Sequence, residues 1–139
     1  NMLEVLVTGG VNILKAFNLL IPPECKCIPE SDSDLKAFYE YNAKHMESWD
    51  GPAGIVLTDG RYAACVTDRN GLRPARYIIT DDRHITVASE IGVYEYDEKN
   101  VIEKGKLGPG QIIAVDTSDG KILYSSNIDE KLKNRCPYK

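Results

Sequence analysis

The densest group of chemically capable side chains lies between residues 68 and 74. An aspartate, two arginines, an Asn-Gly pair and a proline fall within this segment: Asp68, Arg69, Asn70, Gly71, Arg73 and Pro74. Carboxylate and guanidinium groups at this spacing can pair across a turn or hold a charged ligand. Asn and Gly accept left-handed backbone conformations most readily, so Asn70-Gly71 can turn the chain tightly. These signals favour a rigid charged turn, with a ligand contact as the alternative.

The four cysteines offer thiol or metal chemistry. Cys25 and Cys27 provide two thiols, but neither histidine of the chain lies at a spacing typical of a zinc finger, so no metal site is predicted. Cys65 lies in an apolar run and is predicted to be a small core residue. Together with Cys136, these cysteines do not form the framework of a disulfide-rich chain, and a reducing cytoplasm is the expected compartment.

Two further segments have partial signatures of a site. Ser89 and Glu90 follow a predicted strand and could pair a nucleophile with a base, but no histidine is placed by the sequence to complete a triad. A loop contact or an internal hydrogen bond is the favoured role. Residues 108–110, Gly-Pro-Gly, share only their glycines with a phosphate-binding loop and lack its lysine and helix. They are predicted to form a turn before a strand.

The composition describes one domain, or part of one. The chain has 139 residues and a net charge of -4, which argues against general attraction to nucleic acid or to anionic lipid. Its longest apolar stretches, such as residues 53–57, fall far short of the roughly 20 residues that a membrane-spanning helix needs. We therefore expect a chain that binds neither nucleic acid nor membrane.

Helices are expected over about residues 2–46. Residues 2–7 have no capping residue before them, so we expect the end of a helix whose beginning lies upstream. Residues 11–21 repeat apolar side chains with helical spacing and end at a Pro-Pro pair. Asp32 or Ser33 can cap a third helix, which places a mostly apolar face against a sheet.

Antiparallel strands are expected over about residues 53–125, followed by a short C-terminal segment. Three hairpins are indicated by polar turns, two of which contain Asp-Gly, and their strand pairs are 53–57 with 62–66, 76–80 with 84–88, and 111–115 with 121–124. The first strand is apolar on both faces, so at least one sheet should be covered on both sides, with the helices as cover. The predicted class is α+β.

Five motifs follow one another along the chain: Trp49-Asp50-Gly51-Pro52-Ala53, Thr58-Asp59-Gly60-Arg61, Asp68-Arg69-Asn70-Gly71-Leu72-Arg73-Pro74-Ala75-Arg76-Tyr77, Ala88-Ser89-Glu90-Ile91-Gly92 and Lys104-Gly105-Lys106-Leu107-Gly108-Pro109-Gly110. In this order and spacing, the chain resembles the large chains of bacterial glutamate synthases of the NADPH type. Shorter versions of some motifs also occur in phosphoribosyl-pyrophosphate amidotransferases, which are the alternative. Both are N-terminal-nucleophile amidotransferases. The resemblance implies that residues 1–139 are part of a type 2 glutamine amidotransferase domain with a four-layer αββα fold, in which helices cover antiparallel sheets.

The resemblance also implies what this chain lacks. In that family an N-terminal cysteine attacks the amide of glutamine, and an upstream Asn-Gly pair stabilises the oxyanion. This chain begins with Asn1, whose amide cannot act as the nucleophile, and the family's glutamine-binding arginine and aspartate also lie upstream. No catalytic residue is therefore carried over. The motif residues 68–71, 73–74 and 89–90 are predicted to form a turn and an interface, and the isolated chain is expected to be inactive.

Cofactors and partners follow from the same resemblance. FMN, an iron-sulfur cluster and NADPH are implied for the parent enzyme, which makes glutamate from 2-oxoglutarate, and none is expected in this chain. The expected partners are the remainder of the parent chain and its small subunit, with glutamine bound only by the complete domain. Unpaired sheet edges are expected to allow self-association. A self-standing binding module without catalysis is the alternative of a different class.

Overall fold

The structure is a computed structural model, and it describes residues 1–23, 28–90 and 92–134. In chain order its elements are α1 (Met2–Thr8), α2 (Ile13–Leu20), α3 (Ser33–Ala43), β1 (Gly54–Thr58), β2 (Tyr62–Thr67), β3 (Ala75–Thr80), β4 (Ile85–Ala88), the 3-10 helix η2 (Glu98–Asn100), β5 (Val101–Leu107), β6 (Ile112–Asp116), β7 (Lys121–Tyr124) and α4 (Ser125–Lys133).

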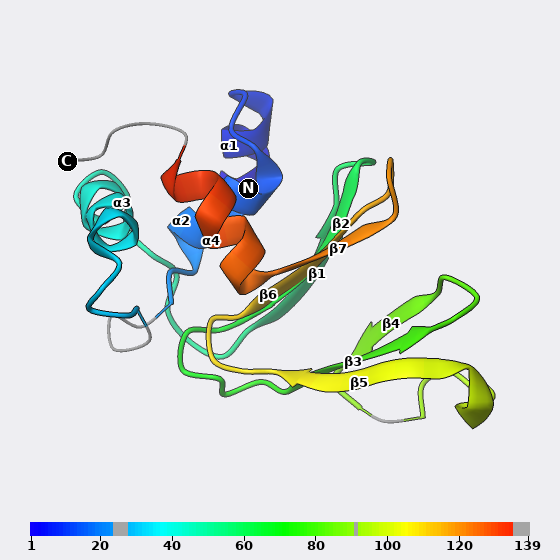
Figure 1. The fold of residues 1–139 in the computed structure, drawn as a ribbon. Helices are drawn as coiled ribbons and strands as arrows, with labels where there is room; N and C mark the ends of the chain where they lie inside the picture. Colours follow the sequence, from blue (N-terminus) through cyan, green and yellow to red (C-terminus); the bar gives the residue numbers. More distant parts are fainter. Residues whose placement is uncertain (24–27, 91, 135–139) are drawn as a thin grey trace.

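The strands form two antiparallel sheets. Sheet A has the order β1-β2-β6-β7, and sheet B has the order β4-β3-β5. Sheet B is built from the segment between β2 and β6, so the chain leaves sheet A, makes sheet B and returns. The helices gather on one side of sheet A, and sheet B lies on the other (Figure 1). This mixed arrangement of helices and antiparallel sheets confirms the predicted α+β class.

Two buried clusters lie on the two faces of sheet A. The larger packs Phe17, Leu20 and Phe38 of the helices against Val66 and Ile112 of the sheet, together with other apolar residues. The smaller lies between the sheets and consists of Cys65, Ala75, Leu107 and Ile113. The middle strands β2 and β6 are thus covered on both faces, as expected. The edge strand β1 differs, because its neighbours leave one of its faces open to solvent.

The helix starts show where local sequence decides structure. Asp32 caps α3, since its carboxylate accepts from the Leu35 amide at 3.1 Å. The expectation that the first helix lacks a cap is wrong: the Asn1 side chain accepts from the Glu4 amide at 3.2 Å, and the Glu4 carboxylate accepts from the Asn1 amine at 2.9 Å. The first helix therefore begins at Met2 with a reciprocal cap. None of the helices in the described ranges has the length and apolar character to cross a membrane.

Two elements were absent from the expectations. In β5 the exposed positions are Ile102, Lys104 and Lys106, and the inward positions include Glu103 and Gly105, so the apolar pattern of a strand is weak. Gly105 is needed because the Tyr77 ring lies against it, and a Cβ there would meet the ring carbon Cζ at 2.3 Å. The helix α4 replaces the predicted short C-terminal segment. It buries Ile128 and Leu132, which lie four residues apart on one face.

A polar bridge joins the two sheets beside the smaller cluster. The hydroxyl of Tyr77 in sheet B donates to Glu103 Oε1 at 2.7 Å, and the hydroxyl of Tyr124 in sheet A donates to Glu103 Oε2 at 2.9 Å. The bond to the carboxylate, with burial adding to it, raises the pKa of Tyr77 to about 12. Both tyrosines therefore keep their protons at neutral pH and can hold the sheets together.

The hairpin tips of sheet A are joined by a second polar contact. Arg61, in the turn between β1 and β2, donates from Nη2 to Asp116 Oδ2 at 3.0 Å. The Arg61 guanidinium, followed by the Ser118 hydroxyl, holds the pKa of Asp116 well below its usual range. The predicted Asp-Gly turn is confirmed, with Gly60 at φ 89°.

The helical layer contains a half-buried carboxylate with a testable pH dependence. Asp129 of α4 accepts a hydrogen bond from the Tyr39 hydroxyl at 2.8 Å. Burial raises the pKa of Asp129, against the opposing effect of that bond. The folded state then binds the proton more tightly than the unfolded state, whose aspartate titrates near about 3.9. This contribution to stability is fully present below that value and is lost as pH rises through the folded pKa.

Replacing Asp129 with asparagine is expected to remove this loss, because the amide oxygen can still accept from Tyr39 without carrying charge. Thermal melts should be measured from pH 4 to 7, a range that begins at the ordinary aspartate pKa of about 3.9. Over this range the fall in Tm should be smaller for Asp129→Asn than for the wild type. Asp129→Ala is the control, since it leaves the Tyr39 hydroxyl without its acceptor and should lower Tm throughout. Equal pH slopes for wild type and Asp129→Asn would contradict the assignment.

Candidate functional site

Most of the motif segments converge where the two sheets join. Arg76 pairs with Ala88 and Ala75 pairs with Leu107, so the segments before β3, after β4 and after β5 meet at one end of sheet B. Gly54 pairs with Thr67, which brings the start of β1 to the same region. We call this region the motif junction; it consists of residues 49–53, 68–74, 89–90 and 108–110. The motif at residues 58–61 lies at the opposite end of β1.

Asp68 is the centre of the motif junction. Only 3% of the surface of Asp68 is exposed. The carboxylate accepts from the Leu72 amide at 2.7 Å and 2.8 Å through its two oxygens, and from the Arg73 amide at 3.2 Å. These bonds close the 68–74 turn on one buried acid. The carboxylate is therefore used by its own turn.

The backbone of Asp68 ties this turn to two other motif segments. Its amide donates to the Ala53 carbonyl at 2.8 Å, and its carbonyl accepts from the Gly110 amide at 2.8 Å. The same carbonyl accepts from the Gly71 amide at 3.1 Å. The Gly71 N–H therefore points into the turn, where it is not free to stabilise an oxyanion.

Two glycines allow the segments to approach closely. Gly71 has a φ of 66°, and a Cβ there would lie 2.8 Å from Cγ of Pro109. Gly110 has a φ of 64°, and a Cβ there would lie 3.0 Å from Cα of Pro23. At both positions the backbone is left-handed and another segment of the same chain lies in contact. Only glycine accommodates this combination without strain.

Side chains around the centre add further links. The Thr67 hydroxyl donates to the Gly108 carbonyl at 2.7 Å, and the Gly108 amide donates to Gln111 Oε1 at 2.8 Å. Arg69 pairs with Asp50, with Nη2 and Oδ1 at 3.1 Å. The turn is thus held by polar contacts to residues 49–53 and 108–110.

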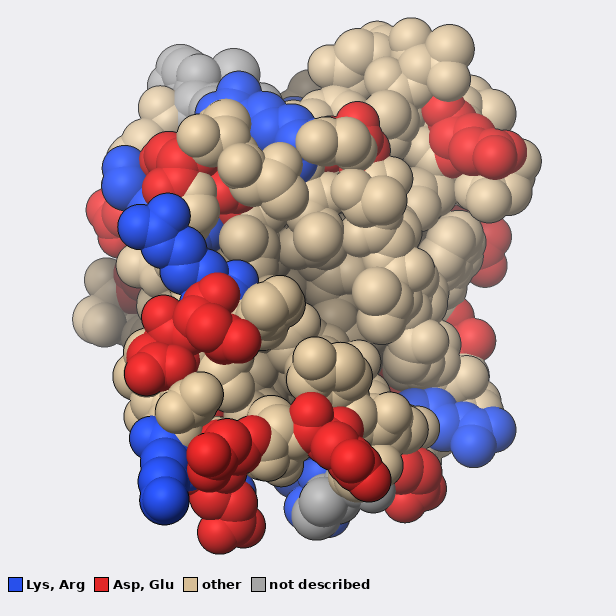
Figure 2. All heavy atoms as spheres, turned by 90° about the vertical axis from the view of Figure 1, so that its right-hand side faces the viewer, with Lys and Arg blue, Asp and Glu red and all other residues tan. Residues whose placement is uncertain are grey.

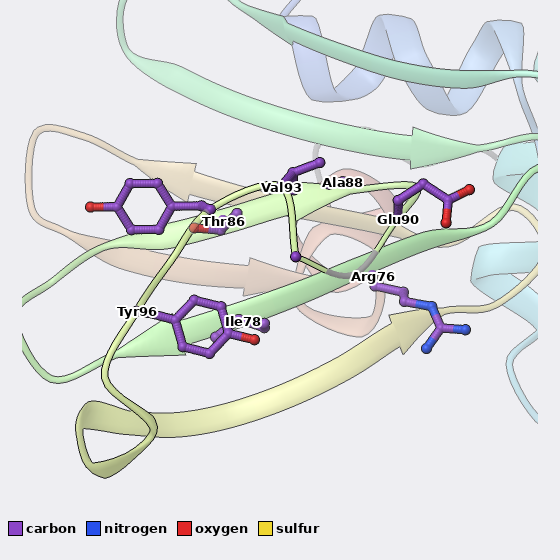
Figure 3. A pocket seen from close by; sticks show the side chains of 9 residues that line it. Arg76, Ile78, Thr86, Ala88, Glu90, Val93 and Tyr96 are labelled. Atoms are coloured by element: carbon purple, nitrogen blue, oxygen red, sulfur yellow. The ribbon is translucent and has the colours of Figure 1, made fainter.

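The remaining predicted residues lie on the surface. Asn70, Arg73 and Pro74 are exposed, as are Ser89 and Glu90. Glu90 lines a small pocket on the outer face of sheet B, and Figure 3 shows its side chain at the same end as that of Arg76. This pocket has a volume of about 30 Å³, room for about one water molecule. The structure therefore does not bring Ser89 and Glu90 into a substrate-sized cavity.

A larger hollow lies beside the motif junction. Its volume is about 230 Å³, below the roughly 300 Å³ at which ligand pockets usually begin. The residues that line it are Ile21, Trp49, Asp50, Gly51, Pro52, Ala53 and Asp68. Its two carboxylates are already engaged, by Arg69 and by the 68–74 turn. The hollow offers little to orient a substrate.

Thiol and metal chemistry find no place among the described residues. Cys65 is buried between the sheets, as predicted, and burial raises the pKa of its thiol to about 11, so it stays protonated at neutral pH. In the described ranges no group of three or more His, Cys, Asp and Glu side chains is arranged to hold a metal ion. Cys25, Cys27 and Cys136 lie outside the described residues.

Acidic and basic side chains are interspersed on the face drawn in Figure 2, around a centre of uncharged residues. That face corresponds to the right-hand side of Figure 1, where the hairpin tips of both sheets lie. Mixed charge of this kind produces no strong field of one sign.

Sequence reasoning missed the residues that join the sheets. Glu103 and Tyr124 were not singled out, and Tyr77 was noted only as part of a motif and as a strand residue. The sequence signal for this strand was the alternation of exposed and inward residues in 101–107. Gly105 lies directly opposite Tyr77. Glycine opposite an aromatic residue on a neighbouring strand is a recognised arrangement.

Comparison with known proteins identifies the family. Residues 1–139 match the family described as glutamine amidotransferases class-II. The chain is 42% identical to a ferredoxin-dependent glutamate synthase of Antithamnion sp. and 42% identical to the NADH glutamate synthase of Saccharomyces cerevisiae, in each case over 100% of this chain and over 9% and 6% of the relative. It is 37% identical to the NADPH glutamate synthase large chain of Bacillus subtilis, over 99% of this chain and 9% of that protein. The chain thus spans less than a tenth of the length of these relatives.

The match extends over the whole chain, includes the motif junction, and agrees with the mixed helical and antiparallel architecture. The resemblance inferred from the five motifs is confirmed. This chain belongs to the class-II glutamine amidotransferases.

Proposed function

We propose that residues 1–139 form the C-terminal part of the glutaminase domain of a glutamate synthase. In the parent enzyme this domain would hydrolyse glutamine and supply ammonia for the reductive synthesis of glutamate from 2-oxoglutarate. The names of the relatives support the parent, since they are glutamate synthases. They favour it over a phosphoribosyl-pyrophosphate amidotransferase.

The role of this part is to hold the two sheets in register. One observation carries this proposal: the Asp68 carboxylate accepts hydrogen bonds from residues 72 and 73, and its carbonyl accepts from Gly71 and Gly110. A buried acid whose acceptors are used by neighbouring backbone stabilises a turn and is poorly placed to act as a base. The family motif is therefore proposed to fix the junction of the sheets beside the missing catalytic part.

The residues that the structure describes lead us to place the redox cofactors of the parent outside this part. An iron-sulfur cluster takes four cysteine thiolates, and the described residues contain a single cysteine, Cys65, which is buried. FMN, the cluster and NADPH are accordingly proposed for other domains. Relatives whose names print ferredoxin, NADH and NADPH match this chain at 37–42% identity, which supports a position for the electron-donor site outside these residues.

The partners proposed for this part follow from the small share of its relatives' length that it spans. It would pack against the remainder of the parent chain and lie near a small subunit, in the cytoplasm. Glutamine would bind only to the complete domain. In the parent reading frame we expect a cysteine directly after the initiator methionine, with a cluster-binding cysteine motif and a flavin-binding barrel downstream.

The isolated chain is expected to release no ammonia from glutamine above the buffer blank. A coupled assay on the folded, purified chain measures this. Activity that coelutes with the chain would contradict the proposal, and a variant lacking all four cysteines would show whether a thiol is responsible. Titration calorimetry with glutamine, 2-oxoglutarate and nucleotides should give no binding heat. Tight binding of any of them would indicate a self-standing binding module instead.

A further inference from the structure

Asn70 and Gly71 form a dipeptide whose own covalent chemistry the proposed function does not use. Among the asparagines of the chain, Asn70 is the one that a glycine follows. The backbone nitrogen after an asparagine can attack the side-chain amide carbon, and glycine hinders this attack least because it has no Cβ. The dipeptide is therefore the place where the sequence is most open to deamidation.

The reaction needs only water and a base. The Gly71 nitrogen loses its proton to the base and bonds to Cγ of Asn70, and the side-chain amide takes up a proton and leaves as ammonia. The product is a five-membered succinimide ring. Water then breaks one of its C–N bonds, at Cγ to leave aspartate or at the backbone carbonyl to leave isoaspartate. No electrons are transferred, and the net change replaces NH₂ by OH.

The side chain of Asn70 is open to this reaction. Asn70 is exposed, and its side-chain amide has no hydrogen bond to the part of the chain that the structure describes. Water therefore reaches the carbon that would be attacked. Any control over the reaction has to come from the Gly71 nitrogen.

The folded turn holds that nitrogen away from the reaction. The Gly71 amide donates to the Asp68 carbonyl at 3.1 Å. The amides of Leu72 and Arg73 donate to the Asp68 carboxylate at 2.7 Å and 3.2 Å. The succinimide ring includes the Gly71 nitrogen and leaves it without a proton, so its bond to Asp68 must be lost first. The turn therefore has to open before the ring can close.

Packing restrains the same movement. A Cβ on Gly71 would lie 2.8 Å from Cγ of Pro109, so this residue lies directly against the proline ring. The Asp68 carbonyl also accepts from the Gly110 amide at 2.8 Å, which fixes the acceptor from a second segment. A reaction that proceeds only through an open state is slowed by the small fraction of time that this state exists.

We propose that Asn70 is a latent deamidation site, protected by the bonds to Asp68 and converted to aspartate or isoaspartate when the turn is released. The conversion is a permanent mark of unfolding, because water does not restore the amide. Isoaspartate adds a methylene group to the backbone between residues 70 and 71, so the Leu72 and Arg73 amides no longer align with Asp68. A chain that stays unfolded long enough then loses the ability to refold.

Peptide mass spectrometry on the full chain tests the protection. Folded wild type and wild type unfolded in guanidinium chloride are incubated side by side at mildly alkaline pH and then digested with trypsin at mildly acidic pH. The exchange of NH₂ for OH raises the mass of the peptide that begins at Asn70, and isoaspartate is separated from aspartate by chromatography. The folded chain should react at least about tenfold more slowly, because opening the turn breaks several hydrogen bonds.

Two substitutions of Asp68 make the test specific for the turn. In chains shown to be folded by circular dichroism, the rate at Asn70 should rise from wild type to Asp68→Asn to Asp68→Ala. Trypsin cleaves after Arg69, so a reaction at residue 68 is measured on a different peptide. Asp81→Ala is the control and should react like the wild type. If Asp68→Ala does not fold, the comparison of Asp68→Asn with the wild type decides.

Three results would overturn the proposal. They are equal rates for folded and unfolded wild type, equal rates for folded wild type and Asp68→Asn, and an unfolded chain that gains no mass at residue 70.

Asn70→Gln tests the effect of the modification on refolding. Glutamine would have to form a six-membered ring, which is much slower, and it fits the site because Asn70 is exposed and lacks a positive φ. The refolding yield of the wild type should fall with time in denaturant, while that of Asn70→Gln should fall much less. Equal losses would overturn the claim that the mark blocks refolding. Ammonia from Asn70 is released once per chain and without glutamine, which distinguishes it from glutaminase activity.

Discussion

Replacing Asp68 with alanine is expected to lower the free energy of unfolding by about 3 kcal/mol or more. The substitution leaves the part-buried Leu72 and Arg73 amides without their acceptor, and each such loss costs about 1–3 kcal/mol. It also removes the bonds that close the 68–74 turn, and the positions of Gly71 and Gly110 depend on that turn. Chemical denaturation with urea measures the effect as a lower midpoint at unchanged slope.

Two variants make the Asp68 result specific. Asp68→Asn keeps one acceptor oxygen but turns an NH₂ group toward backbone amides, so an intermediate loss is expected. Asp81→Ala is the control, because Asp81 is an exposed aspartate at the end of β3. It should stay within about 0.5 kcal/mol of the wild type, as surface substitutions usually do. A loss of that small size for Asp68→Ala would show that the carboxylate does not organise the motif junction.

Gly71→Ala should be the second large effect, with a loss of about 2–5 kcal/mol. The left-handed backbone at φ 66° costs about 1–2 kcal/mol for a residue with a Cβ. The new methyl group would also lie 2.8 Å from Cγ of Pro109, and overpacking of this kind typically costs about 1–3 kcal/mol. Pro109 cannot swing aside as a long side chain would, because its ring is part of the backbone.

A second glycine separates strain from collision. Gly120 has a φ of 68°, and no heavy atom lies within 4 Å of a Cβ built there, so Gly120→Ala should show the backbone cost alone. The difference between the two alanine variants then measures the contact with Pro109. Adding Pro109→Ala to Gly71→Ala should recover part of the loss, as expected for neighbours in contact. Equal losses for Gly71→Ala and Gly120→Ala would mean that the two turns do not touch.

The fold was predictable where local signals are strong. The Asp-Gly turn at residues 59–60 and the cap at Asp32 depend on residues close in sequence, and both were placed correctly. β5 was not, because its inward positions include Gly105 and Glu103, which make sense only against Tyr77 on another strand. α4 was missed for a related reason: Ile128 and Leu132 are its only buried residues, and the surface that buries them is formed by distant helices and strands.

The candidate site was predictable in composition but not in geometry. The sequence shows that residues 68–74 can turn tightly, and the structure shows the turn centred on Asp68. That Gly110 would bond to Asp68, and that Pro109 would lie on Gly71, depends on β2 and β6 being neighbours. This pairing is long-range, and no local pattern specifies it. The close contact at Gly71 therefore depends on the tertiary structure.

The insertion of sheet B between β2 and β6 has a consequence for the speed of folding. Val66 pairs with Ile112 only after the whole of sheet B has been looped out, and loop closure of this length costs entropy before any sheet contact repays it. The bond from the Gly110 amide to the Asp68 carbonyl lies at the base of that loop. If the base forms in the transition state, weakening it will slow refolding more than it speeds unfolding. The motif that marks the family would then set the rate at which the two sheets find each other.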